Sequence, residues 1–562
     1  MKKRVSKFIS LALTAAMVLS LAGCGSSDSA ESAPAESGTE TTASGETANS
    51  TEESTQTAAS GEKIVNIGVT DSLGSINPFV IDQTFINKYA VDLQFLPLVE
   101  FDENLNFEYI LADSITTEDN KNFIVHINDD ATWSDGNPIT AYDVEYSFLR
   151  LASPIVANAT LVYNVFEGVG DDGFVEEGAT GVSGVQVIDD KTIQFTTKEP
   201  MSMITFQSAY ACYLHTMPKH VIEKFSEAEL TTQDWFNHPD VVSGPFMVTD
   251  YDTDHYISYV ANKNYWKGAP KIDKLNIKIV DSSQVYSGLQ SGEIDVTHHT
   301  MTNIPQEDME SIEALDNVNV VYGSPVTNQS VFIQTENIPD VRVRQALVYA
   351  IDRQKIVDEL LKGHGEVVEG FLSSASPYYD DSITPYGYDP EKAKELLAEA
   401  GWDGSQTLRF FVNSGDGTFV NAAQVMVAQW AAVGIKVEVQ TVDLATLMSM
   451  AGSTDYDLFA VQYTYPPIDP SVDIAWLLSG AESWTGYSDP SIDEALGKVG
   501  MTEDIAGLKE LYATIDKKVQ EDVPMFSAYI ISAQGAVSKR LTNVHANVYG
   551  FFNNIQEWDV VE

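Results

Sequence analysis

The pattern of hydrophobic and polar positions divides residues 63–562 into a β-rich part and a part in which helices alternate with strands. Apolar and polar side chains alternate over 63–69 and end in the polar turn 70–74, so a strand is predicted there. Between about 100 and 240, short apolar runs such as 123–127 and 192–195 are separated by turns of Asp, Gly and Asn. This stretch is therefore predicted to be rich in strands.

Apolar residues at helical spacing are common in the later part of the chain. Asp340, Asp352 and Asp389 each precede such a run and are predicted to cap a helix. Strands are predicted at 408–412 and 435–439, where apolar residues follow a period of two. We find no repeat of fixed length, which disfavours a solenoid or a propeller. The alternation of helices and strands predicts an α/β arrangement.

The first residues have the pattern of a bacterial secretion signal. Four basic residues within the first seven are followed by an apolar run over 8–21 and then by Leu21-Ala22-Gly23-Cys24. This ending resembles a lipobox, in which cleavage before Cys24 leaves that thiol to carry a lipid. We therefore expect residues 1–23 to be a signal peptide and Cys24 to be lipidated. A plain signal peptide with an incidental cysteine is the alternative.

The segment after Cys24 has the composition of a tether. Residues 25–62 contain no aromatic residue and no Ile, Leu, Val, Met, Lys or Arg. Such a segment cannot bury enough apolar surface to offset the entropy lost on ordering. Its eight acidic residues also repel one another and extend it. We expect residues 24–62 to be a disordered acidic tether, which holds the folded residues 63–562 outside the membrane.

The charge and the cysteine count exclude several classes of protein. The chain has 32 Lys and Arg against 82 Asp and Glu, for a formal charge of −50. A field this negative repels nucleic acid before any base is read. The two cysteines, Cys24 and Cys212, are too few for a disulfide framework or a Cys-based zinc site. Cys212 lies in an apolar segment, so we expect an inert packed thiol.

Short motifs in the sequence give little support for a catalytic site, a metal site or a cofactor site. Residues 168–173 match a dinucleotide-binding glycine pattern, but acidic residues surround them and disfavour a phosphate. Residues 250–254 resemble the start of a calcium loop that lacks the required Gly and Glu. His298 and His299 could share a metal only in a bent loop, because neighbours on a regular element point apart. We expect no enzyme, no cofactor and no metal. A secreted hydrolase with paired carboxylates is the alternative from a different class.

Several short segments follow one another in a characteristic order along residues 123–435. They are Asp135-Gly136, Thr140-Ala141-Tyr142-Asp143-Val144-Glu145-Tyr146-Ser147, Ser243-Gly244-Pro245-Phe246, Asn262-Lys263-Asn264-Tyr265-Trp266-Lys267-Gly268-Ala269-Pro270, Ser291-Gly292-Glu293-Ile294-Asp295, Asp340-Val341-Arg342-Val343-Arg344-Gln345-Ala346, Tyr388-Asp389-Pro390-Glu391-Lys392-Ala393 and Val433-Gly434-Ile435. In this order they resemble the family 5 extracellular solute-binding proteins of bacterial ABC importers, the group that contains oligopeptide and dipeptide receptors.

This resemblance implies an α/β fold of two lobes joined by hinge strands. It is the type II, cluster C form of the periplasmic-binding-protein fold, with an extra β-rich subdomain in the first lobe. We expect the first lobe at 63–100, 241–325 and 528–562, the inserted subdomain at 101–240 and the second lobe at 326–527. The hinges would lie near residues 325 and 527.

The resemblance also implies that the protein binds a ligand without catalysing a reaction. A monomer at the outer face of the cytoplasmic membrane would capture a ligand between its lobes and pass it to a permease and ATPase complex. A signalling or adhesion lipoprotein on the same fold is an alternative.

Both lobes must then supply ligand contacts, because closure is selected only by contacts that differ between the open and closed forms. Tyr and Trp suit such a site because they combine rigid apolar area with a polar edge. Each predicted residue could alternatively belong to a surface loop or to a core. The predicted contacts are Thr70, Asp71, Ser72 and Asn77 from the first lobe, and Asn328, Gln329, Asn413, Tyr463, Tyr465, Asp469 and Trp484 from the second.

One departure from the family pattern bears on the ligand. Dipeptide-binding members carry an Arg that pairs with the ligand carboxylate, and our alignment places Asn413 there. They also carry an Asp for the ligand ammonium, in a stretch that here reads Tyr463-Thr464-Tyr465-Pro466-Pro467-Ile468-Asp469-Pro470. Losing both anchors would cost a short zwitterion about 2–5 kcal/mol for each pair. We therefore expect a peptide longer than a dipeptide, with an uncharged ligand such as an oligosaccharide as the alternative.

Overall fold

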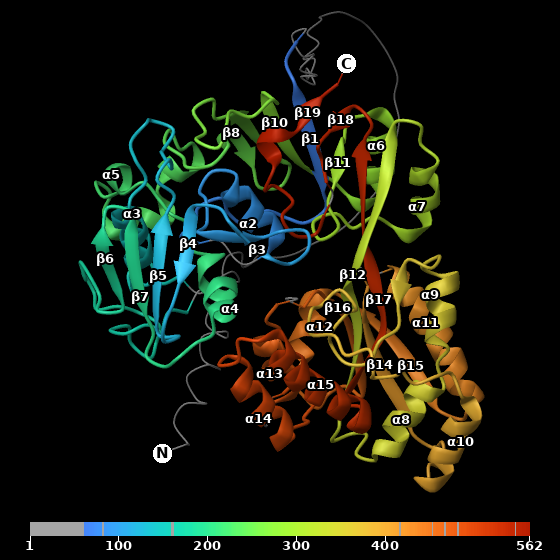
Figure 1. The fold of residues 1–562 in the computed structure, drawn as a ribbon. Helices are drawn as coiled ribbons and strands as arrows, with labels where there is room; N and C mark the ends of the chain where they lie inside the picture. Colours follow the sequence, from blue (N-terminus) through green and yellow to red (C-terminus); the bar gives the residue numbers. More distant parts are fainter. Residues whose placement is uncertain are drawn as a thin grey trace, which may run out of the picture. The chain divides into compact units, whose positions relative to one another are not determined.

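The computed structural model describes residues 61–80, 84–158, 162–414, 417–451, 453–465, 468–479, 483–545 and 547–561. The predicted signal peptide, the lipidation site Cys24 and the tether up to residue 60 lie outside the described residues. The described chain is a mixed α/β structure (Figure 1). Among its helices, none has both the length and the apolar character needed to cross a membrane.

The first lobe is built around the strand predicted at 63–69. Val65, Ile67 and Val69 of this strand are fully buried, as the alternating pattern predicts. The strand pairs in parallel with one neighbour on each side, β10 and β11. The elements of this lobe are β1 (Ile64–Val69), α2 (Phe85–Asp92), β8 (Phe246–Asp252), β9 (Tyr256–Ala261), β10 (Lys274–Ile279), α6 (Ser282–Ser291), β11 (Val296–Thr297), α7 (Gln306–Glu313), β18 (Leu541–Thr542), η4 (Ile555–Glu557) and β19 (Asp559–Val560).

The inserted subdomain contains its own four-stranded antiparallel sheet, in the order β4-β5-β7-β6. Cys212 is buried in its core, and burial raises the pKa of this thiol. The prediction of a packed, unreactive thiol agrees with this placement. The elements are β2 (Val99–Phe101), β3 (Phe107–Tyr109), β4 (Ala112–Thr116), β5 (Asn122–Ile127), α3 (Ala141–Leu151), β6 (Val185–Asp189), β7 (Thr192–Thr196), α4 (Met203–Phe206), η1 (Gln207–Ala211), α5 (Lys219–Ile222), η2 (Glu227–Thr232) and η3 (Asp234–Asn237).

The second lobe alternates helices and strands. Asp340, Asp352 and Asp389 each accept a backbone N–H from the first turn of the helix that follows, so their predicted role as caps is confirmed. The elements are α8 (Val341–Tyr349), α9 (Arg353–Glu359), β13 (Gly365–Glu366), α10 (Pro390–Glu399), β14 (Thr407–Asn413), α11 (Gly417–Ala432), β15 (Lys436–Val442), α12 (Leu444–Met450), β16 (Leu458–Tyr463), α13 (Ser471–Leu478), α14 (Pro490–Val499) and α15 (Ile505–Asp522).

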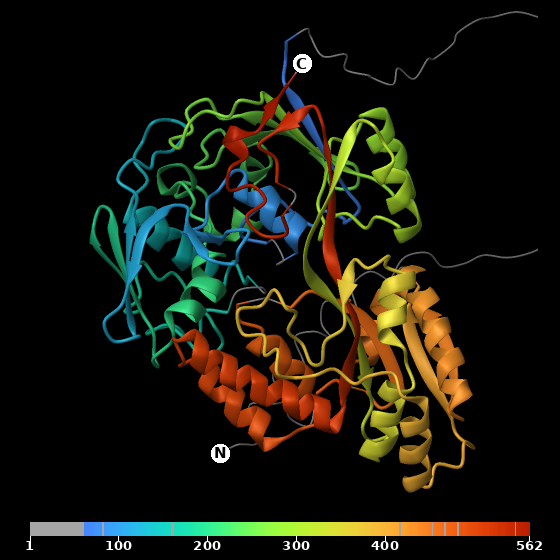
Figure 2. The same cartoon turned by 45° about the vertical axis from the view of Figure 1, so that its right-hand side comes forward.

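Two long strands, β12 (Val318–Ile333) and β17 (Met525–Ser538), connect the lobes. They run antiparallel side by side from one group of elements to the other, which Figures 1 and 2 both show. The strand order β15-β14-β16-β12-β17-β11-β1-β10-β9-β8 places this pair between the second-lobe strands and the first-lobe strands. A single sheet therefore continues through both lobes.

The pairing of β12 with β17 is interrupted near the middle. Its register shifts between Tyr322 and Pro325 and again between Pro325 and Thr327. Such irregularities bend a strand pair and increase its twist. Ala528 and Ile531 still pack in the second-lobe core. We propose that β12 crosses between the lobes between Pro325 and Thr327, and that β17 crosses after Ile531 rather than near the expected residue 527.

Candidate functional site

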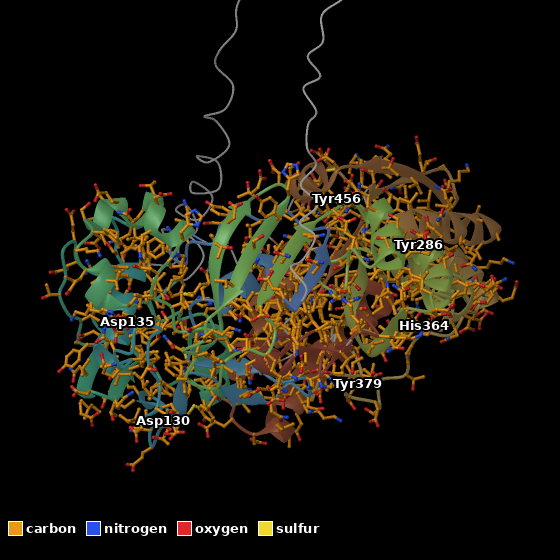
Figure 3. The ribbon with its side chains drawn as sticks, turned by 90° about the horizontal axis from the view of Figure 1, so that it is seen from above. Asp130, Asp135, Tyr286, His364, Tyr379 and Tyr456 are labelled. Atoms are coloured by element: carbon orange, nitrogen blue, oxygen red, sulfur yellow. The ribbon has the colours of Figure 1, made fainter. Side chains whose placement is uncertain are left out.

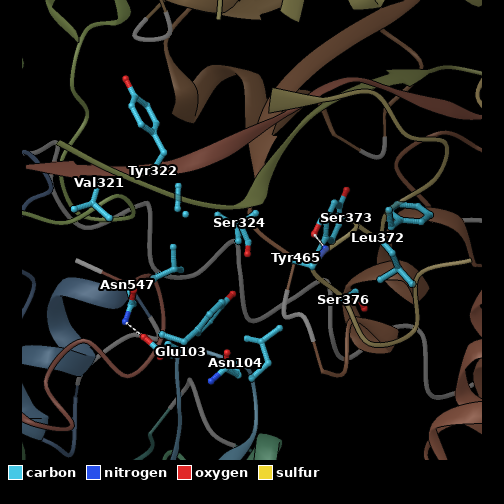
Figure 4. A pocket seen from close by; sticks show the side chains of 18 residues that line it. Glu103, Asn104, Val321, Tyr322, Ser324, Leu372, Ser373, Ser376, Tyr465 and Asn547 are labelled. Carbon is cyan, nitrogen blue, oxygen red and sulfur yellow. Dashed lines mark hydrogen bonds between the residues drawn. The ribbon is translucent and has the colours of Figure 1, made fainter. Parts of the chain in front are cut away.

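A cavity of about 370 Å³ lies beside the long strands, and we call it the aromatic cavity (Figure 4). Its volume falls in the range of about 300–1,000 Å³ that is typical of ligand sites. Its wall combines the start of the inserted subdomain, a first-lobe segment near the C-terminus, both long strands and second-lobe loops. The wall residues are 103–105, 321–324, 326, 371–373, 375, 376, 465, 533 and 547–549.

The wall of the aromatic cavity mixes apolar side chains with polar groups, and several of the polar groups are held in place by hydrogen bonds. Tyr465 Oη lies 3.1 Å from Ser330 Oγ. Asn547 Nδ2 donates to Glu103 Oε2 at 2.6 Å, as the dashed line in Figure 4 marks. Tyr322 donates to Glu313 at 2.6 Å, so its hydroxyl is already engaged. These bonds fix the direction of the polar groups before a ligand enters.

A second cavity of about 350 Å³ is also lined by both lobes, and we call it the Asp71 cavity. Gln462 and Thr464 line this cavity, whereas Tyr465 lines the aromatic cavity. Successive residues of an extended segment point to opposite sides, so the two cavities lie on opposite sides of this segment. The wall residues are 71, 85, 299, 300, 302–304, 306, 327, 418, 462, 464, 531 and 534.

A chain of hydrogen bonds crosses the wall of the Asp71 cavity. The Gln534 N–H donates to His299 Nδ1 at 3.2 Å, so the proton of this ring lies on Nε2. His299 Nε2 therefore donates to Thr327 Oγ1 at 3.1 Å, and Thr327 Oγ1 lies 2.9 Å from Thr464 Oγ1. Burial lowers the pKa of His299 to about 4, which keeps the ring neutral at neutral pH. The bonds join the first lobe, both long strands and the second lobe.

Asp71 supplies the one carboxylate among the described residues that line this cavity. It follows β1 directly, and the backbone N–H groups of Thr70 and Asp71 donate to Met301 O at 2.8 and 3.2 Å. Asp71 is exposed to solvent. The surrounding protein nevertheless raises the pKa of this carboxyl to about 6 by desolvation.

The other first-lobe residues predicted to touch ligand have different surroundings. Thr70 Oγ1 accepts the Asn303 N–H at 2.7 Å. Ser72 is exposed and does not line either cavity. Asn77 is buried and donates to Leu230 O at 2.8 Å. The structure therefore places only Asp71 of this group in a cavity wall.

The predicted contacts on the second-lobe strands also lie outside the two walls. Asn328 and Gln329 are both buried in β12, and Asn328 Nδ2 donates to Gly370 O at 3.4 Å. Asn413 is the last residue of β14 and pairs with Val442 of β15. A role for these three residues in binding stays a prediction.

The predicted aromatic and acidic residues of the second lobe divide between the cavity and the core. Tyr465 lines the aromatic cavity, and its ring lies 4.6 Å from that of Tyr463. Tyr463 donates to Asp473. Trp484 packs 5.4 Å from the Phe332 ring, within the second-lobe core. Of these aromatic residues, only Tyr465 lies in a wall.

Asp469 takes part in a contact between the inserted subdomain and the second lobe. Thr205 Oγ1, in α4, donates to Asp469 Oδ2 at 3.2 Å. Ser202, which caps the N-terminus of α4, donates its backbone N–H to Gly500 O at 3.0 Å. Ile204 packs against the second-lobe core. We call this contact the α4 latch, and it holds the two lobes together at a place outside both cavity walls.

Sequence reasoning missed most of the aromatic wall. Glu103, Tyr549 and the segment 371–376 lie in loops without periodic patterning. The pairing of β12 with β17 brings them together from distant parts of the chain. The sequence presents His299 as half of a histidine pair, whereas the structure places it in the wall of the Asp71 cavity.

The histidine pair does not point to a shared site. His298 is fully buried, and its Nε2 donates to Asn547 O at 2.9 Å, while His299 lines the Asp71 cavity. Within the part of the chain that the structure describes, no group of three or more His, Cys, Asp and Glu side chains is placed to hold a metal.

Comparison with curated proteins finds relatives along most of the chain. The oligopeptide-binding protein AppA of Bacillus subtilis is 25% identical over 487 residues, covering 82% of this chain and 85% of AppA. The glutathione-binding protein GsiB of Pectobacterium atrosepticum is 25% identical over 495 residues, covering 85% and 91%. The heme-binding protein A of Haemophilus influenzae is 28% identical over 357 residues, covering 60% and 62%. These relatives are named for binding rather than for catalysis.

Solved structures share the fold. The structure of Bacillus subtilis AppA with a nonapeptide has a TM-score of 0.70 at 22% identity, covering 89% of this chain and 100% of that one. CtaP from Listeria monocytogenes, an ABC transporter substrate-binding protein, has a TM-score of 0.75 at 23% identity, with coverage of 89% and 100%. The expected two-lobed periplasmic-binding-protein fold is thereby confirmed.

The family model for bacterial extracellular solute-binding proteins, family 5, matches residues 106–485. This match covers more than half of the chain and includes parts of both lobes. The chain belongs to the family 5 bacterial extracellular solute-binding proteins.

Proposed function

We propose that the chain captures a peptide in the cleft between its lobes and delivers it unchanged to the permease and ATPase complex of an ABC importer. The observation that carries this proposal is that each cavity wall combines residues of the first lobe, the long strands and the second lobe. A ligand held there touches both lobes, so its binding energy favours the closed arrangement.

Two observations support a peptide longer than a dipeptide. AppA of Bacillus subtilis is named for oligopeptides, and its solved structure contains a nonapeptide. Asn413 stands where the alignment places the carboxylate-binding Arg of dipeptide receptors. A longer peptide can compensate for this loss through its backbone and through side chains that fill the aromatic cavity.

An oligosaccharide is the second candidate, and the composition of the aromatic cavity favours it. Tyr549 lines this cavity with a flat aromatic ring, and Ser373 and Ser376 line it with hydroxyl groups. Sugar rings pack on such faces and exchange hydrogen bonds with such hydroxyls without any need for a charged partner.

The proposed location follows from the sequence of the first residues. A lipid on Cys24 would hold a monomer at the outer face of the cytoplasmic membrane, on the acidic tether 24–62. The lipid anchor is tested by the change Cys24→Ser, which should move the protein from the membrane fraction to the medium or the periplasm. Retention of the variant in the membrane would contradict the anchor.

Calorimetry against peptide pools of graded length tests the proposed ligand. We expect saturable heat for pools longer than dipeptides, and recovery of each peptide at unchanged mass after dissociation. Heat from an oligosaccharide, with none from any peptide pool, would overturn the peptide assignment. Shortened peptides after incubation would instead indicate a hydrolase.

A further inference from the structure

We infer that the peptide binds through a cationic group at Asp71 and places no free carboxylate in either cavity. This inference rests on the proposed function and adds the chemical class of the ligand. It is carried by the charged groups that line the two cavities.

Neither cavity wall contains a Lys or an Arg among the described residues. The undescribed positions between residues 61 and 561 hold no Lys or Arg in the sequence either. Lys362 borders a different cavity, which it shares with Glu307, Glu310 and Glu313. A ligand carboxylate in either of the two cavities would therefore lose water without gaining a cationic partner from their walls.

The remaining candidates for binding an anion are also unfavourable. His299 is neutral at neutral pH, and both of its ring nitrogens are already bonded, Nδ1 to the Gln534 N–H and Nε2 to Thr327. The N-terminus of α11 reaches the Asp71 cavity at Thr418. The sequence places an acidic residue, Asp416, two positions before Thr418, and acidic residues next to a helix N-terminus weaken its attraction for anions in general.

Negative groups, in contrast, are present in both walls. Asp71 lines one cavity, and Glu103, held by Asn547, lines the other. Asp71 is exposed to solvent, but the protein around it removes part of the hydration of its carboxylate, and a cation beside it would replace that hydration. The aromatic ring of Tyr549, which lines the aromatic cavity, offers further attraction to a positive group. The formal charge of −50 also raises the local concentration of cations around the protein.

The test compares four forms of one random pentapeptide pool by calorimetry on the full-length protein. The ends of the peptides are free, acetylated at the amine, amidated at the carboxyl, or blocked at both. We expect the pool with a free amine and an amidated carboxyl to bind at least as tightly as the free pool. Acetylation should weaken binding by about tenfold, as expected for the loss of a partly desolvated charge pair.

Two matched variants assign the effect to its residue. Asp71→Asn should remove most of the difference between free and acetylated pools. Asp130→Asn should leave that difference as it is in the unchanged protein. Asp130, labelled in Figure 3, is exposed on the inserted subdomain and lines neither cavity.

The other possible results of these binding experiments would each contradict either the inference, the role of Asp71 or the proposed function. Tightest binding by the acetylated pool with a free carboxyl, or equal binding by all four forms, overturns the inference and leaves peptide capture standing. An unchanged preference in Asp71→Asn overturns the role of Asp71. Failure of every pool to bind overturns the proposed function itself. The comparison of the four pools on the unchanged protein needs no variant, so it stands even if a variant fails to fold.

Discussion

His299 Nε2 donates a hydrogen bond to Thr327 Oγ1 across 3.1 Å, and this bond joins the first lobe to a strand that continues into the second. Thr327 in turn lies 2.9 Å from Thr464 of the second lobe. Both groups line the Asp71 cavity, so the residues that connect the lobes also form part of the candidate binding site. Ligand binding and lobe movement are therefore expected to be coupled through them.

Replacing Thr327 by Val tests this connection with little change of shape. The His299 N–H and the Thr464 hydroxyl would both lose a partner, which should lower the free energy of unfolding by about 1–3 kcal/mol. Urea unfolding measures this loss. The control is Thr116→Val, at an exposed position of β4, which should stay within about 0.5 kcal/mol. Equal stability of the two variants would contradict the proposed connection.

The buried histidine pair predicts a loss of stability in mild acid. Burial lowers the pKa of His298 to about 3 and that of His299 to about 4, whereas an unfolded histidine has a pKa of about 6.5. Between these values the unfolded chain binds more protons, so the free energy of unfolding falls as the pH falls. The slope approaches about 1.4 kcal/mol per pH unit for each histidine.

The change His298→Gln isolates this effect, because Gln can still donate to Asn547 O and does not titrate. The original protein should be the more stable form at pH 7.5, and its advantage should shrink by about 2 kcal/mol at pH 5. Urea unfolding of both proteins at the two pH values measures the change. A constant difference would show that His298 is not held neutral.

The Arg353–Glu369 ion pair predicts a large effect from a single change. Both side chains are buried, and Arg353 also donates to the backbone oxygens of Val368 and Ser527. Glu369→Ala would leave the guanidinium buried without its counter-charge, which should lower the free energy of unfolding by about 3–5 kcal/mol. Because segment 371–376 follows directly, we also expect weaker ligand binding.

An exposed ion pair in the same lobe provides the control for Glu369→Ala. Lys355 and Glu359 lie 3.8 Å apart with their side chains largely in solvent. Glu359→Ala should change the free energy of unfolding by less than about 1 kcal/mol. Similar losses from the two alanine variants would contradict the structural role assigned to Glu369.

The α4 latch predicts a change in affinity at a residue outside both cavity walls. Thr205→Val removes the bond to Asp469, together with the local 3.0 Å bond between the Thr205 and Ser202 hydroxyls, and should weaken ligand binding by about two- to tenfold. The dissociation rate should rise accordingly. Thr249→Val, at an exposed position of β8, serves as the control. Unchanged affinity in Thr205→Val would show that the latch contributes nothing to closure.

Local features of the fold could be predicted from the sequence, because they depend on neighbouring residues. The alternation over 63–69 predicts β1, and Asp340 and Asp389 predict where two helices begin. Asp71 could be placed in the site because it follows a buried strand. Trp484 shows the limit of such reasoning, since a large aromatic ring suits both a core and a binding wall, and here it packs on Phe332.

The aromatic wall could not be predicted in this way. Segments 103–105, 371–376 and 547–549 are far apart in sequence and carry no periodic signal. They meet because β12 pairs with β17 on both sides of the register shifts near Pro325, and this pairing is a property of the complete sheet. No local pattern in the sequence therefore indicates that these three segments are neighbours in the structure.

Small-angle X-ray scattering, recorded before and after saturation with a binding peptide and again after its removal, tests the central claim most directly. The claim is that two lobes joined by β12 and β17 close on a peptide and release it unchanged. We predict a smaller radius of gyration in the saturated protein, a return to the first profile on removal, and a peptide of unaltered mass. Superimposable profiles at proven saturation would contradict the account.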